Sequence, residues 1–92
     1  MPYLIEDQRY YLLQNGLGDL AVSMVAADIK EFKGMINYIN HFLVKTYLRA
    51  QEKDSYFITS TAINGVEDAA DELRRRLLHR FEDGAIKRNG DI

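Results

Sequence analysis

The chain has 92 residues with no cysteine, one proline (Pro2), and a net charge of −2 from 12 Lys and Arg against 14 Asp and Glu. This length predicts one domain, residues 1–92, and the apolar fraction of 47% is too high for intrinsic disorder. The lack of cysteine excludes disulfides, thiolate metal sites and a cysteine nucleophile. No apolar run reaches the ~20 residues of a membrane span and no leader-like segment precedes the domain, so we expect a cytoplasmic protein with no membrane partner.

The N-terminal half is predicted to form an extended arm and three helical stretches. We expect the arm at residues 1–6 and a short helix at about residues 7–15, interrupted by Gly16 and Gly18. Apolar residues then recur at helical spacing over residues 17–32 and again over 35–51. Gly34 is expected to separate these two helices, because glycine often follows the last helical residue.

The C-terminal half is predicted to be one long helix after a polar turn at residues 51–55, with Ser55 or Asp54 as its N-cap. Residues 57–61 have a strand-like composition, but an apolar stripe at helical spacing continues to Phe81. Gly65 either marks the close approach of another helix or is an ordinary exposed position. Gly84 is expected to end or bend the helix, leaving residues 84–92 as a tail. The predicted fold class is all-α, a small three- to four-helix bundle with a long C-terminal helix.

An acidic cluster on this helix is the best indication of an enzyme. It consists of Glu67, Asp68, Asp71 and Glu72, whose spacing places them on one side of a helix, where carboxylates can hold Mg²⁺. Glu67-Asp68-x-x-Asp71 resembles the first half of the acidic motif of all-α nucleotide pyrophosphohydrolases. The second half is missing downstream, and Asp28-x-x-Glu31 has the wrong order. The alternative is a solvated face on which Asp71 pairs with Arg75 and Glu72 with Arg76.

Arginines follow the acidic cluster at positions 74–76 and 80, and Arg75, Arg76 and Arg80 are candidates for binding an anion. Acidic residues precede them on the same helix and no aromatic stacking platform lies beside them, which argues against nucleic acid as a partner. A solvated face or interface salt bridges are the alternative.

Six tyrosines are more than the interior of so small a bundle can accommodate. Tyrosine is enriched at protein interfaces, because it combines apolar area with a polar tip. We therefore expect a self-association surface that includes Tyr3, Leu4, Tyr10 and Tyr11, on the arm and first helix. The alternative is that the tyrosines lie flat over the rim of the bundle.

Short motifs at both ends and in the middle of the chain resemble a family of small proteins of bacteriophages and bacteria. They are Met1-Pro2-Tyr3-Leu4, Ile36-Asn37-Tyr38-Ile39 and the closing Phe81-Glu82-Asp83 with Asn89-Gly90-Asp91-Ile92. The corresponding family motifs are Met-Pro-Tyr-Ile, Leu-Asn-Tyr-Ile and Tyr-Glu-Asp…Asn-Gly-Asp-Val. This resemblance implies an all-α, phage-linked protein and supplies no catalytic residues.

Two hypotheses of different classes follow for the function. The first is a non-enzymatic helical interaction protein, acting as a homo-oligomer, with a dimer favoured, or as an adaptor for another protein, in the cytoplasm of a bacterial or phage-infected cell. The second is a Mg²⁺-dependent nucleotide hydrolase that uses Glu67, Asp68 and Asp71. The first hypothesis requires no cofactor.

Overall fold

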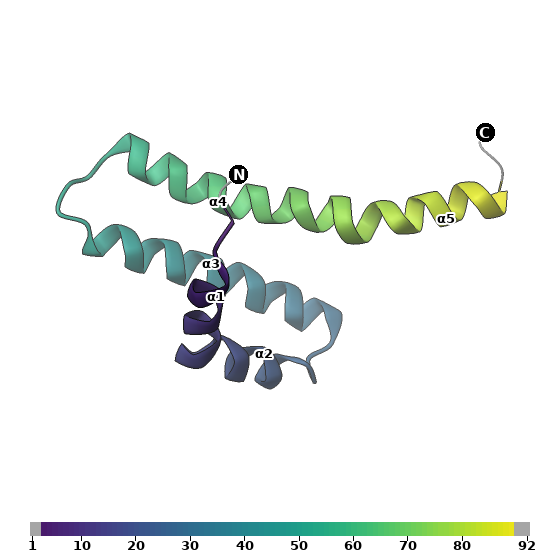
Figure 1. The fold of residues 1–92 in the computed structure, drawn as a ribbon, viewed down its shortest axis with the longest axis horizontal. Coiled ribbons are helices and arrows are strands. Elements are labelled where there is room, and N and C mark those ends of the chain that lie inside the picture. Colours follow the sequence, from purple (N-terminus) through teal and green to yellow (C-terminus); the bar gives the residue numbers. More distant parts are fainter. Residues whose placement is uncertain (1–2, 90–92) are drawn as a thin grey trace. The chain divides into compact units, whose positions relative to one another are not determined.

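The computed structural model describes residues 3–89, and every regular element among them is helical. The elements are α1 (Glu6–Leu12), η1 (Leu13–Leu17), α2 (Gly18–Met24), α3 (Ile29–Ala50), α4 (Tyr56–Leu73), η2 (Arg74–Leu78) and α5 (His79–Asn89), shown in Figure 1. The predicted all-α class is confirmed. Residues 1–2 of the predicted arm and 90–92 of the predicted tail lie outside the described range.

The chain divides into two compact units, residues 1–42 and residues 43–92, and the boundary falls within α3. The first unit contains α1, η1, α2 and the first part of α3. The second contains the last turns of α3, the polar turn, and the helical run of α4, η2 and α5.

The start of α1 is stabilised by its own side chains. Residues 3–5 are not helical, and Ile5 has extended backbone, in line with the predicted arm. The Gln8 Oε1 accepts a hydrogen bond of 3.1 Å from the Ile5 N–H, which satisfies one of the N–H groups left free at a helix start. Glu6 and Asp7 place negative charge in the first turn, where the helix dipole favours it.

The predicted break at Gly16 is confirmed and has a backbone cause. Gly16 has φ of +116°, and Asn15 beside it is also outside the helical region, so η1 joins α1 to α2 across a kink. Residues with a Cβ rarely adopt such a φ, whereas glycine does so without steric cost. The Asn15 Nδ2 donates to the Tyr11 carbonyl oxygen at 2.7 Å, which satisfies a carbonyl of the last turn of α1.

The continuous helix predicted over residues 17–32 is wrong: residues 18–24 are helical, but the chain leaves the helix after Met24 and α3 begins at Ile29. Asp28 causes the new start: its Oδ1 accepts a 2.8 Å hydrogen bond from the Glu31 N–H. This is the geometry of an N-cap. The carboxylate motif Asp28-x-x-Glu31 is therefore a helix-capping pattern.

The expected helix end at Gly34 is also wrong, since α3 continues through this glycine to Ala50. A Cβ placed on Gly34 would have no neighbour within 4 Å, so no close contact requires glycine there. An interior glycine costs a helix only about 1 kcal/mol, and the apolar pattern on both sides of Gly34 outweighs that cost.

The polar turn at residues 51–55 is confirmed, and Ser55 is the N-cap of α4: its Oγ accepts a hydrogen bond of 3.3 Å from the Ile58 N–H. The helix then continues through η2, a π-helical turn, into α5 and reaches Asn89 (Figure 1). The helix therefore does not end at Gly84. Capping at one end and an apolar stripe along the length explain this long helix.

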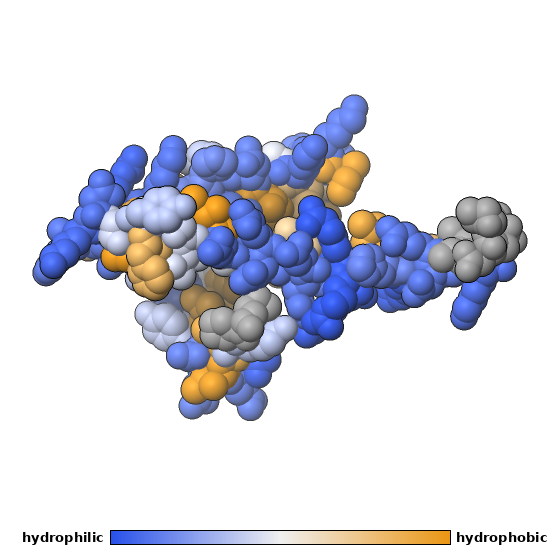
Figure 2. Space-filling model, turned by 90° about the horizontal axis from the view of Figure 1, so that it is seen from above, coloured by the Kyte–Doolittle hydropathy of each residue, from blue (hydrophilic) through white to orange (hydrophobic). Residues whose placement is uncertain are grey.

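Little apolar surface is buried within the described residues, among which Met24 is the one buried hydrophobic side chain, with 8% of its surface exposed. Leucine, isoleucine, phenylalanine and tyrosine side chains reach the surface from both units. Figure 2 shows apolar patches between hydrophilic side chains on the face in view.

Candidate interaction surfaces

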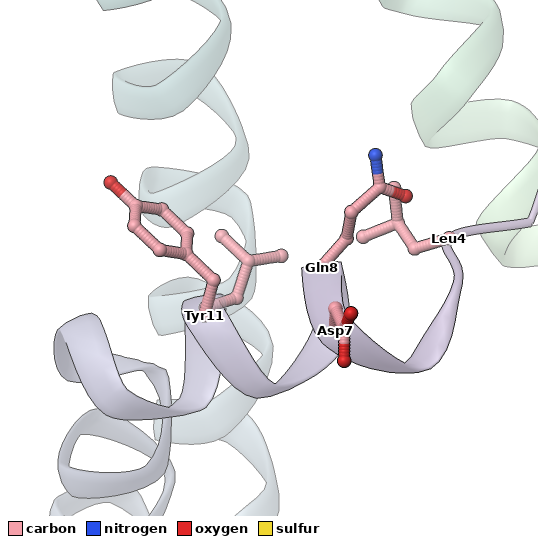
Figure 3. A pocket seen from close by; sticks show the side chains of 5 residues that line it. Leu4, Asp7, Gln8 and Tyr11 are labelled. Atoms are coloured by element: carbon pink, nitrogen blue, oxygen red, sulfur yellow. The ribbon is translucent and has the colours of Figure 1, made fainter.

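The arm and α1 form the first candidate surface. Leu4, Gln8 and Leu12 are four residues apart, with Asp7 and Tyr11 on the same side of the helix, and these five side chains line an open hollow (Figure 3). The apolar members are exposed, and Tyr11 retains 65% of its accessible surface. This surface, which we call the α1 surface, provides apolar area with a polar rim.

The α1 surface contains two of the four residues predicted for an interface. Leu4 and Tyr11 line the hollow, whereas Tyr3 and Tyr10 are exposed outside it. Sequence reasoning missed Gln8 and Leu12, although their spacing from Leu4 is the helical signal that identifies them. Tyrosine content alone does not reveal which residues share a helix face.

Two members of the acidic cluster, Asp71 and Glu72, pair with arginines of the same helix. Glu72 accepts hydrogen bonds from Arg75 Nη2 and Arg76 Nε, and Asp71 accepts one of 3.1 Å from Arg74 Nη1. The predicted Glu72–Arg76 pair is present, whereas the partner of Asp71 is Arg74. The hydrogen bonds from Arg75 and then Arg76 lower the pKa of the Glu72 carboxyl to about 2.

No group of three carboxylate or histidine side chains within residues 3–89 is arranged so that it could hold a metal ion. Asp28, the nearest approach in sequence to a second acidic motif, accepts the Glu31 N–H. The arrangement of the described carboxylates thus offers no support for the hydrolase hypothesis.

The arginines proposed for anion binding have different surroundings. Arg75 and Arg76 donate to Glu72, whereas the Arg80 guanidinium carbon lies 5.6 Å from the centre of the Phe81 ring. That distance is typical of a cation–π contact. Arg80 is therefore held by a different kind of contact from the one that Arg75 and Arg76 make with Glu72.

The long C-terminal helix carries the second candidate surface. Val66 and Ala70 are half-buried, whereas Leu73 and Leu77, farther along the same stripe, expose 56% and 49% of their surface. These four residues, spaced four, three and four apart, are called the C-terminal stripe below. Leu78 and Phe81 extend the exposed apolar area beyond it.

Within the described range, no helix is both long enough and apolar enough to cross a bilayer. A protein-family model described as a domain of unknown function, DUF6899, matches residues 1–92, so the chain belongs to this family. No curated protein and no solved structure matches the chain.

Proposed function

We propose that this chain is a non-enzymatic helical interaction module that forms a homo-oligomer, with a dimer as its basic unit. One observation carries the proposal: Met24 is the one buried hydrophobic side chain of the described residues, while leucines and aromatic residues in both units are exposed. Exposed apolar surface on this scale is typical of proteins that bind another protein chain.

The energetic reason is the small contribution of the chain's own core. Burying a Leu or Phe side chain contributes about 1.5–3 kcal/mol to the stability of a fold. Most of the large apolar side chains here keep at least 40% of their surface exposed, so they contribute only part of that amount. A small domain that lacks a sufficient core often gains one by oligomerising. In the assembly we propose, helices of different copies complete a three- to four-helix bundle.

The α1 surface contributes to this assembly in our proposal. Tyr11 and Leu12 provide apolar area, and Asp7 and Gln8 provide the polar rim that protein interfaces have. The phage link implied by the end motifs belongs to the same proposal, with the assembly acting in the cytoplasm of a bacterial or phage-infected cell.

Sedimentation equilibrium from low to high micromolar concentration tests the proposal. We expect a mass of at least two chains, dissociating on dilution, together with far-UV circular dichroism that loses helicity as the assembly dissociates. A monomer that keeps its full helicity and cooperative unfolding at all concentrations would overturn the proposal.

A further inference from the structure

The charges that flank the C-terminal stripe change sign at a single residue. Between Ser55 and Leu73 the helix carries acidic residues and no basic ones. From Arg74 to Phe81 it carries arginines and no acidic residue. Leu73, one of the exposed members of the stripe, lies at the change.

We propose that the C-terminal helices of two copies pair antiparallel through this stripe, with the two-fold axis close to Leu73. The inference rests on the proposed homo-oligomer and names its contact. An antiparallel pair places the acidic segment of each copy beside the arginine segment of the other, twice over. A parallel pair places acidic beside acidic and basic beside basic.

The spacing of the stripe suits such pairing. Its four-three-four pattern is the seam of a coiled coil, in which side chains of one helix fill the spaces of the other. In an antiparallel pair, residues from opposite ends of the stripe face each other. Leu73 then packs against Ala70 of the second copy, and Leu77 packs against its Val66. Large residues then face small ones, which favours close packing.

One pair of charges beside the seam makes the argument specific. Glu67 and Arg74 are seven residues apart and so lie on the same flank of the stripe. A two-fold rotation brings equal flanks together, so Glu67 of each copy meets Arg74 of the other. Arg74 already pairs with Asp71, but the two side chains are 60% and 76% exposed, and exposed pairs contribute little.

A second copy is the occupant that these charges select. An interface with two-fold symmetry uses the same patch on both chains and must be complementary to itself. Acidic and basic runs on either side of Leu73 meet that requirement.

Distances between spin labels test the direction of pairing. Because the chain has no cysteine, a single cysteine introduced at a chosen position is the one site that carries the label. The contacts of Leu73 with Ala70 and of Leu77 with Val66 of the second copy are both centred between residues 71 and 72, so the two-fold axis passes there. The exposed residues Asn64 and His79 lie at equal distances on either side of this axis. Labels on N64C in both copies are then separated by about 22 Å along the helices, as are labels on H79C. A mixture of N64C and H79C chains gives a short distance, set by the ~8–10 Å between helix axes and the label length.

Each outcome separates the inference from the proposed function. Long same-site distances with a short mixed distance support antiparallel pairing. Short same-site distances mean parallel pairing. If neither the same-site distances nor the mixed distance is short, the dimer uses another surface. Both outcomes overturn this inference and leave the proposed homo-oligomer intact. A monomer in sedimentation overturns the proposed function itself.

Exchange of charges gives a second test. E67K alone and R74E alone each place like charges opposite one another twice, so each variant should self-associate about tenfold more weakly. An equimolar mixture should regain wild-type affinity, because the lysine introduced in one chain then faces the glutamate introduced in the other. E82K, a charge change far from the axis, is the control and should leave the affinity unchanged. Failure of the mixture to regain affinity would overturn the inference.

Discussion

Two glycines of this chain should respond to alanine in opposite directions. At Gly16 an added Cβ meets no atom within 4 Å, so the effect of alanine on stability depends on the backbone conformation alone. The φ of +116° at this position is one that alanine adopts poorly. We expect Gly16→Ala to lower the free energy of unfolding by about 1–2 kcal/mol. At Gly65, inside α4 and equally open, Gly65→Ala should raise it by up to about 1 kcal/mol.

Urea unfolding followed by far-UV circular dichroism measures both effects, at one protomer concentration because association adds to stability. The two effects together amount to about 1–3 kcal/mol, so in thermal unfolding the two variants should differ by about 4–24 °C in Tm, given ~4–8 °C per kcal/mol for a domain of this size. Gly34→Ala, in the interior of α3 and also open, is the matched control and should behave like Gly65→Ala.

Two results would refute the reasoning. A Gly16→Ala variant as stable as wild type would mean that the kink does not need positive φ. A Gly65→Ala variant less stable than wild type, with Gly34→Ala more stable, would mean that another helix packs against Gly65, the alternative that the sequence left open.

Three other perturbations test the caps, the ion pairs and the α1 surface. Asp28→Ala should cost about 1 kcal/mol in urea unfolding, because the Glu31 N–H loses its acceptor, while Asp19→Ala should cost less. Folding lowers the pKa of the Glu72 carboxyl to about 2, so its ion pairs stabilise the fold above the ordinary carboxyl pKa of ~4.3 and this stabilisation is lost as the pH falls toward 2. The Tm of wild type should therefore exceed that of Glu72→Gln by less and less over this pH range. A Tm difference that stays constant would contradict this prediction. Tyr11→Lys should weaken self-association in sedimentation about tenfold, whereas an unchanged affinity would exclude Tyr11 from the contact.

The cap at Ser55, the break at Gly16 and the long helix were predictable because their causes are local. Ser55 bonds a backbone N–H three residues away, and Gly16 supplies a backbone conformation that few residues adopt. The pair of Glu72 with Arg76 was predictable for the same reason, since residues four apart on a helix are neighbours.

The break before α3 escaped prediction because apolar residues on both sides of it keep helical spacing. Asp28 and Glu31 carried the signal, but three-residue spacing is shared by a capping pattern and a carboxylate pair. Gly34 misled in the opposite sense: glycine is common after a helix, yet one glycine in an apolar repeat does not end it.

The candidate surfaces show where sequence reasoning stops. The helical spacing of apolar residues identified the stripe through Leu73 and Leu77. This spacing does not distinguish a buried stripe from an exposed one. Leu4 and Tyr11 were chosen for their chemistry, and the hollow they share with Leu12 depends on their common helix face.

Composition, capping chemistry and periodicity were enough to establish an all-α chain with its longest helical run at the C-terminal end, because helices form from interactions within a few residues. Where α3 begins, and which parts of the apolar stripes remain uncovered, became clear from the folded chain. Exposure depends on what packs against a residue, and the residues that do so are distant in the sequence or, as we propose for Leu73, belong to a second copy.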